Sequence, residues 1–203
     1  MRKDNAIKIS IKKYRVILII LLITLIIIIG LIINRTIKYD SAEEQAQNIL
    51  TAMSEIKVLD GNELEVAVEN TKMNGHQVIG SIKIESVGLE YPILDETNEE
   101  TLNLAITKLS GPDLNTNGNV TLAGHNNRNG KLFSKLPSVK VGDVIEITDM
   151  KNNTVKYEVY KIYTVEPTDI TCTYTTDPNK KEITLITCTL GAIKRIVVKA
   201  SEI

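Results

Sequence analysis

The sequence is poor in aromatic residues and in the side chains that bind metals. It contains no Trp, one Phe, two Cys and two His in 203 residues. Two Cys are too few for the disulfide framework of a small secreted domain. Neither a Cys-x-x-Cys nor a His-x-x-x-His spacing occurs, which argues against a structural zinc site. We therefore expect no metal and no cofactor.

The sequence also lacks an excess of charge of either sign. The 24 Lys and Arg nearly balance the 25 Asp and Glu, which gives a formal net charge of −1. Because nucleic-acid binding requires a basic patch or stripe, this composition gives no support for a nucleic-acid partner.

One long apolar run is present near the N-terminus. Residues 16–33 carry no charge and are interrupted only by Thr24 and Gly30. That length reaches the lower end of what a membrane-spanning helix needs. Six basic residues precede it, whereas only Arg35 and Lys38 follow closely; the six are Arg2, Lys3, Lys8, Lys12, Lys13 and Arg15. This bias predicts a cytoplasmic tail (1–15), a single transmembrane helix (16–33) and an extracytoplasmic remainder.

A cleaved signal peptide is the alternative interpretation of this run. It would have a shorter apolar core and a small-residue cleavage site, and neither is evident around residues 33–36. The sequence therefore favours an uncleaved anchor in the cell membrane.

Residues 34–77 are predicted to form an extracytoplasmic linker. Between residues 40 and 57, apolar residues recur at helical spacing; they are Ala42, Ala46, Ile49, Leu50, Met53 and Ile56. This amphipathic helix would hold the domain away from the membrane or lie against it. Residues 59–74 read as a polar connection, and His76 as a solvated loop residue.

Residues 78–203 are predicted to form the folded domain. Strand patterns cover residues 78–84, 89–93, 119–123, 143–148 and 154–165. A helical pattern covers residues 99–109, and one helical turn is expected at 131–136. Many short strands with few helices are typical of a mostly-β barrel or sandwich.

The residues around Gly191 predict a hairpin that could carry catalytic side chains. If Gly191 and Ala192 form a two-residue type II′ turn, Cys188 pairs with Arg195 across the two strands. Directly opposed residues share a face of the sheet, so a thiol would lie beside a guanidinium. Such a cation favours the nucleophilic thiolate and stabilises an oxyanion. The plainer interpretation is a buried Cys next to a surface Arg.

His125 is the second candidate catalytic residue. It follows the predicted strand 119–123 and opens a turn rich in Gly and Asn. Catalytic side chains concentrate at such strand ends, and His is the usual proton carrier. The alternative is a histidine in a turn that has no catalytic role.

The second cysteine leaves the nucleophile ambiguous. The four residues Ile-Thr-Cys-Thr occur twice, around Cys172 and around Cys188. Only Cys188 has an Arg in the opposed strand position, so Cys172 is expected to pack in the core or line a neighbouring strand. A Cys172–Cys188 disulfide is a further alternative, and it would silence a thiol enzyme.

These motifs together resemble one known family. Thr184-Leu185-Ile186-Thr187-Cys188 matches the TLxTC signature of sortases, the membrane-anchored cysteine transpeptidases of Gram-positive bacteria. The order of His125, Cys188 and Arg195 also matches, as do the segments Gly80–Ile84 and Tyr91–Ile93. The resemblance implies a closed eight-stranded β-barrel with one or two short helices. It covers residues 78–203 and the N-terminal anchor.

The resemblance also implies roles for individual residues. Cys188 would attack the Thr carbonyl of an LPxTG-like sorting signal at the C-terminus of a surface protein, and His125 would exchange protons with the amines. Arg195 would hold the substrate or the oxyanion. The acceptor would be an amine of a peptidoglycan precursor or of another protein such as a pilin. Ala123, Thr184 and Ile186 would line the signal groove, and residues 173–181 would form its wall.

The Cys172–Cys188 interval leaves no room for the added helix of class B enzymes. No apolar run follows Arg195 and no Asp-Pro-aromatic lid precedes His125, unlike pilus-polymerising enzymes. The chain therefore most resembles a class A or class D sortase, although the interval between Cys188 and Arg195 is shorter than in some housekeeping sortases. Acidic residues near the loop 164–177 form no specific calcium site. Two other functions remain open: a thiol hydrolase of the same fold, in which water is the only acceptor, and a surface binding module without catalysis.

Overall fold

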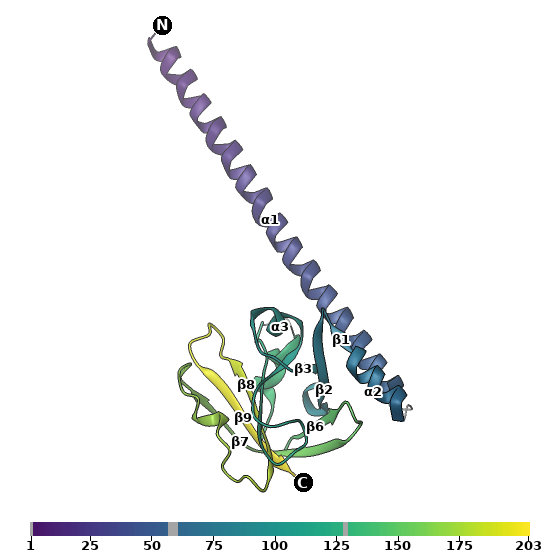
Figure 1. Cartoon of the computed structure of the whole chain (residues 1–203). Helices are drawn as coiled ribbons and strands as arrows, with labels where there is room; N and C mark the ends of the chain where they lie inside the picture. Colours follow the sequence, from purple (N-terminus) through teal and green to yellow (C-terminus); the bar gives the residue numbers. More distant parts are fainter. Residues whose placement is uncertain (1, 57–60, 128–129) are drawn as a thin grey trace. The chain divides into compact units, whose positions relative to one another are not determined.

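The computed structural model describes residues 2–56, 61–127 and 130–203. It divides into two compact units, residues 1–41 and residues 42–203. One helix, α1 (Arg2–Ile56), begins in the first unit and ends in the second (Figure 1).

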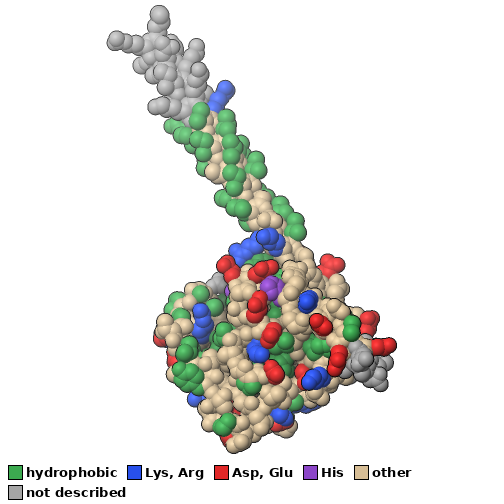
Figure 2. Space-filling view, in the orientation of Figure 1, with side chains coloured by type: hydrophobic (Ala, Val, Ile, Leu, Met, Phe, Trp, Pro, Cys, Tyr) green, Lys and Arg blue, Asp and Glu red, His purple; other side chains and the backbone are tan. Residues whose placement is uncertain are grey.

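Between Val16 and Ile33, α1 is apolar all round. Every large apolar side chain between Val16 and Ile33 is 46% to 67% exposed, and Figure 2 shows hydrophobic side chains coating this part of the helix. A helix without a polar face suits a membrane core rather than water. Within the described residues, one helix is long and apolar enough to cross a membrane, and it is this one. This matches the predicted anchor.

The last turns of α1 belong to the folded unit. Ala46 is fully buried in the barrel's hydrophobic cluster, and Ile49, Met53 and Ile56 pack against that cluster. Tyr91 donates a hydrogen bond to the Glu43 carboxylate at 2.6 Å. The amphipathic helix predicted here therefore lies against the domain.

A short helix and a short strand complete the predicted linker. Helix α2 (Gly61–Asn70) and strand β1 (Lys72–Met73) lead to the barrel, and β1 pairs with the start of β2. Positions 57–60 of the linker lie outside the described residues. The folded unit thus starts well before residue 78, the predicted boundary.

Eight strands close into a barrel. They are β2 (His76–Ile84), β3 (Leu89–Leu94), β4 (Ile106–Ser110), β5 (Gly118–Ala123), β6 (Val144–Asp149), β7 (Thr154–Val165), β8 (Lys181–Cys188) and β9 (Arg195–Glu202). Their order is β2-β3-β4-β5-β8-β9-β7-β6, and pairing of β6 with β2 closes the circle. The predicted eight-stranded barrel is confirmed.

Most pairs are antiparallel, but β3 runs parallel to β4 and β5 runs parallel to β8. Side chains alternate between the two faces of each strand. On β8, Ile183 and Leu185 point into the core, where they meet Val120 and Leu122 of β5. The opposite face of β8 carries Cys188.

The helical pattern predicted at residues 99–109 is half wrong. Helix α3 (Glu99–Leu104) ends at Ala105, which is extended, and the following residues form β4. The start is capped as a helix should be, by a reciprocal pair between Asn98 and Thr101. Ile106 and Thr107 are β-branched and pair with β3, so the sheet overrides the helical spacing.

Three short 3₁₀ helices complete the elements: η1 (Glu85–Val87), η2 (Leu132–Ser138) and η3 (Thr171–Thr173). The second covers the predicted helical turn at 131–136. The third lies in the β7–β8 loop, which we define as residues 166–180.

Candidate active site

Strands β8 and β9 bring Cys188 and Arg195 together. The two residues are direct partners in the antiparallel register. Nη1 of Arg195 donates to Sγ of Cys188 at 2.9 Å, and both side chains are half-buried. The predicted pairing is confirmed, and it places a fixed cation on a thiol.

The turn between these strands differs from the predicted one. The amide of Ala192 donates to the carbonyl of Thr189 at 2.8 Å, so Gly191 occupies the third turn position with φ +86°. A type II′ turn would need Gly at the second position. Ala192 is also left-handed, at φ +57°. The turn type was wrong, but the Cys188–Arg195 register holds because the amide of Thr189 still meets the carbonyl of Lys194 at 2.9 Å.

His125 lies at the end of the strand on the other side of Cys188. The parallel register of β5 and β8 ends with Ala123 opposite Ile186. The chains stay adjacent beyond it, since the Thr187 hydroxyl donates to the Gly124 carbonyl at 2.7 Å. The next residue after His125 contacts Cys188 itself, because Nδ2 of Asn126 donates to the Cys188 carbonyl at 3.0 Å. The turn that carries His125 therefore lies against the end of β8. No pattern in the sequence could indicate that these two segments meet.

The surroundings of His125 favour its neutral form. Partial burial lowers the pKa of the imidazole, and the Arg195 guanidinium lowers the pKa further. Glu99 at the start of α3 opposes both effects by raising it. A neutral imidazole can accept a proton, and its conjugate acid can return one, as general acid–base catalysis requires.

Cys172 occupies a different environment. Its side chain is 4% exposed in the β7–β8 loop, and burial raises the pKa of its thiol. Both thiols are free, so the alternative disulfide is absent from the structure. A buried thiol of raised pKa is a poor nucleophile, which leaves Cys188 as the candidate.

The three residues expected to line the groove share the Cys188 face but differ in exposure. Ala123 and Ile186 are half-buried partners, each two residues before His125 and Cys188 respectively. Thr184 is fully buried, and its hydroxyl donates to Oδ1 of Asn119 at 2.7 Å. Thr184 therefore lies beneath the open surface in this conformation.

Two side chains near the site were not singled out from the sequence. Nδ2 of Asn126 donates to the carbonyl of Cys188 at 3.0 Å and so ties the His125 turn to β8. Lys199 is only 5% exposed in β9, on the same face as Arg195. The signal for Lys199 was one charged residue within the apolar strand pattern that ends the chain.

Among the described residues, no group of three or more His, Cys, Asp or Glu side chains is arranged to hold a metal ion.

Comparison with known proteins agrees with this arrangement. A family profile described as "Sortase domain" matches residues 82–203. The chain belongs to the sortase family. Sortase A of Bacillus anthracis is 31% identical over 182 residues, which cover 83% of this chain and 85% of that protein. Sortase A of Listeria monocytogenes is 29% identical over 189 residues, covering 87% of this chain and 84% of that protein.

Solved sortase structures share the fold. A Clostridium perfringens Sortase D5 transpeptidase superposes with a TM-score of 0.65 at 26% identity, over 79% of this chain and 97% of that one. A lid mutant of Sortase A from Corynebacterium diphtheriae gives 0.60 at 31% identity, over 77% and 92%. These relatives agree with a sortase of class A or class D type.

Proposed function

We propose that this sortase is a cysteine transpeptidase that cleaves an LPxTG-like sorting signal between Thr and Gly. The observation that carries the proposal is the 2.9 Å contact between the Cys188 thiol and the Arg195 guanidinium. The register of β5 and β8, which leads to His125 on the other side of Cys188, supports it.

Acylation uses all three side chains. Neutral His125 takes the proton of the Cys188 thiol as Sγ attacks the Thr carbonyl carbon, and the carbonyl oxygen becomes an oxyanion that the Arg195 guanidinium stabilises. The C–N bond to Gly then breaks, and protonated His125 gives its proton to the leaving amine. The products are a thioester on Cys188 and the released C-terminal fragment.

Deacylation reverses the proton flow. An acceptor amine attacks the thioester carbon while neutral His125 takes the proton that the amine loses. Collapse of the tetrahedral intermediate forms a new amide and releases the Cys188 thiolate. The acceptor is an amine of a peptidoglycan precursor or of another protein such as a pilin. Ala123 and Ile186 flank the path of the sorting signal.

The proposed location follows from the first unit. Helix α1 anchors the enzyme as a single span, with the basic N-terminal tail in the cytoplasm and the barrel outside the cell membrane. Substrates would be surface proteins with a C-terminal sorting signal, which reach this side of the membrane during export.

The test uses the full chain in detergent micelles with a panel of fluorogenic LPxTG-type peptides. Each is incubated with and without an oligoglycine or a diaminopimelate-type amine, using Cys188→Ala and Cys172→Ala as the matched pair. We expect cleavage to be lost only in Cys188→Ala, and the amine to appear in the product.

Other outcomes discriminate between the alternatives. If the peptide is hydrolysed and the added amine never appears in the product, the protein is the thiol hydrolase. Loss of cleavage in Cys172→Ala alone would assign the nucleophile to the other cysteine. No turnover of any peptide, with Cys188 as slow to alkylate as a buried thiol, would indicate a binding module.

A further inference from the structure

A layer of buried polar side chains lies beneath the β7–β8 loop, on the face of the barrel that carries Cys188. Asn119 of β5, Thr184 of β8 and Lys199 of β9 lie side by side there, each at most 5% exposed. Thr184 and Lys199 are direct partners in the strand register. These residues face away from the apolar core but are buried, so their polar groups need partners within the protein.

The partners are backbone carbonyls of the loop. Nζ of Lys199 donates to the Cys172 carbonyl at 3.2 Å and to the Thr184 hydroxyl at 2.9 Å. The Thr184 hydroxyl lies 3.3 Å from the same carbonyl. Nδ2 of Asn119 lies within 3.3 Å of three successive carbonyls, those of Cys172, Thr173 and Tyr174. One turn of the loop is thus held by three side chains from three strands.

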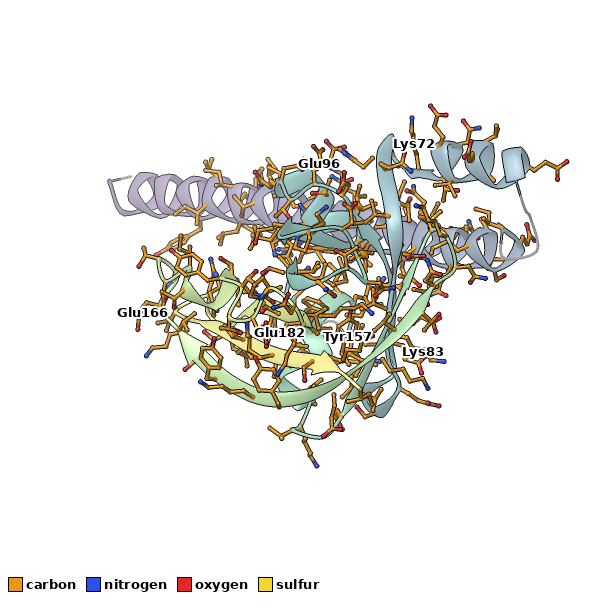
Figure 3. The ribbon with its side chains drawn as sticks, turned by 60° about the horizontal axis from the view of Figure 1, so that its bottom comes forward. Lys72, Lys83, Glu96, Tyr157, Glu166 and Glu182 are labelled. Atoms are coloured by element: carbon orange, nitrogen blue, oxygen red, sulfur yellow. The ribbon has the colours of Figure 1, made fainter. Side chains whose placement is uncertain are left out.

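A second set of bonds holds the end of the same loop. The Thr176 hydroxyl donates to Oε2 of Glu182 at 2.7 Å, and the Tyr160 hydroxyl donates to Oε1 at 3.1 Å. Figure 3 shows Glu182 near the middle of the barrel wall, and Glu166, which opens the loop, at its periphery. Nζ of Lys194 lies 3.2 Å from Oε1 of Glu166, so the β8–β9 turn also contacts the loop.

Within this layer, Lys199 depends most on its hydrogen bonds. Burial lowers the pKa of its ammonium group, and none of the salt bridges found among the described residues includes it. A buried cation is tolerated only where its hydrogen bonds are made. Its two acceptors are the loop carbonyl and the hydroxyl that also contacts that carbonyl. The loop and the ammonium group therefore stabilise each other.

We propose that Lys199 is a positioning residue that fastens the β7–β8 loop to the barrel and so fixes the shape of the groove in which the substrate peptide lies. The inference rests on the proposed function for its kinetic part, because the loop acts as a groove wall only if a peptide binds there. The fastening itself is independent of any activity. Lys199 touches no reacting atom and acts through the loop.

The first experiment measures the fastening without using activity. Cys172 lies within the fastened turn and is the other cysteine of the chain, so in a Cys188→Ala background it reports loop opening by its rate of alkylation. The full chain in detergent is labelled with a maleimide as Lys199→Met and as Thr184→Val, with Lys161→Met as the control. Lys161 is the exposed partner of Lys199 in the β7–β9 register.

We expect Lys199→Met and Thr184→Val to accelerate Cys172 labelling at least about tenfold, and Lys161→Met to leave it within about twofold of the background rate. The acceleration should be independent of urea at low concentration, which marks local opening rather than global unfolding. Thr184→Val keeps the side-chain shape and covers the case in which Lys199→Met does not fold. Unchanged labelling in both variants would overturn the proposal.

The second experiment uses the intact nucleophile and the cleavable peptide. Lys199→Met is expected to raise KM at least about tenfold with kcat within about threefold, because the chemistry at Cys188 is untouched while the wall loses its shape. Faster labelling with unchanged KM would overturn the role in the groove. Faster labelling with no turnover even in the wild type would sink the proposed function and support the fastening.

Discussion

The Arg195 guanidinium is close enough to Cys188 to act both on the thiol and on an oxyanion formed beside it. We expect Arg195→Met to lower kcat/KM by about 10²-fold or more, the usual effect of removing one oxyanion donor. Alkylation of Cys188 by iodoacetamide should also slow in the same variant, because the thiol loses the cation that contacts it. Steady-state kinetics and alkylation rates at one fixed pH measure the two effects.

Lys194→Met provides the matched control for this charge change. It removes the neighbouring cation, which is half-exposed and pairs with Glu166 instead of the thiol. Its rate of Cys188 alkylation should match that of the wild type. An equal slowing in both variants would mean that Cys188 responds to general charge and not to the Arg195 contact.

His125 should make stability depend on pH. Its folded-state pKa is lowered from 6.5, so the unfolded chain binds the proton more tightly. The contribution is therefore fully present above about pH 6.5 and is lost as the pH falls through the folded-state pKa. We compare the wild type with His125→Gln at about pH 7.5 and about pH 5, on either side of the usual pKa of His. The free energy of unfolding should fall more in the wild type than in the variant.

Urea titrations of the two proteins at each pH measure this difference, and the subtraction cancels the groups that they share. A wild type that gains stability relative to His125→Gln on acidification would contradict a lowered pKa.

At the residue scale, the sequence identified His125, Cys188 and Arg195 as candidates, but it could not show that His125 and Cys188 lie close together. The Cys188–Arg195 pairing follows from counting residues around Gly191, because a hairpin register depends on the local turn. His125 and Cys188 lie on strands that are parallel and distant in sequence, so no local spacing sets their register. Lys199 was missed for the same reason, since its acceptors come from the loop between β7 and β8.

At the scale of elements, Gly124 holds the turn that carries His125. A Cβ at this position would lie 2.7 Å from Cδ1 of Ile106 and within 2.9 Å of the Phe133 ring. Since these neighbours are fully buried, we expect Gly124→Ala to destabilise the fold by about 1–3 kcal/mol and to lower kcat by displacing His125. Urea unfolding and peptide cleavage measure the two effects.

The double variant Gly124→Ala with Phe133→Leu tests this explanation. The smaller side chain makes room for the methyl group, so the two substitutions should cost less together than the sum of their separate costs. Simple additivity would mean that the Phe133 ring is not what resists the methyl group.

The elements themselves were largely predictable where the pattern was long. Strands β2, β3, β5 and β7 match the predicted ranges to within two residues at each end. Strand β4 was missed because Leu102, Ala105, Ile106 and Leu109 have helical spacing. Pairing with β3 and β5 decides the strand, and these are tertiary contacts that spacing cannot show.

At the scale of the whole molecule, the end of α1 contributes to the barrel. A chain of residues 42–203 keeps the buried Ala46 and the Tyr91–Glu43 hydrogen bond, whereas the predicted domain 78–203 lacks both. We expect the shorter chain to melt at least about 5 °C lower, because part of the core beneath the helix becomes exposed. Thermal unfolding by circular dichroism compares them.

Ala46→Asp in the longer chain is the point-variant form of this test, with Gln47→Asp on the exposed side of the same turn as its control. Equal melting temperatures for the two chains and for the two variants would mean that α1 only tethers the barrel.

Strand β8 has neighbours on both sides along its length: β5 pairs with residues 181–186 and β9 with residues 182–188. An extended peptide that reaches Cys188 cannot join this sheet as an additional strand, because the backbone groups of β8 are already used. Recognition by β-augmentation reads little beyond an extended backbone; here the peptide must cross the strands and be read through its side chains and the loops above them. Under the proposed function, selectivity for a sorting signal therefore resides in parts that can change while the barrel stays the same.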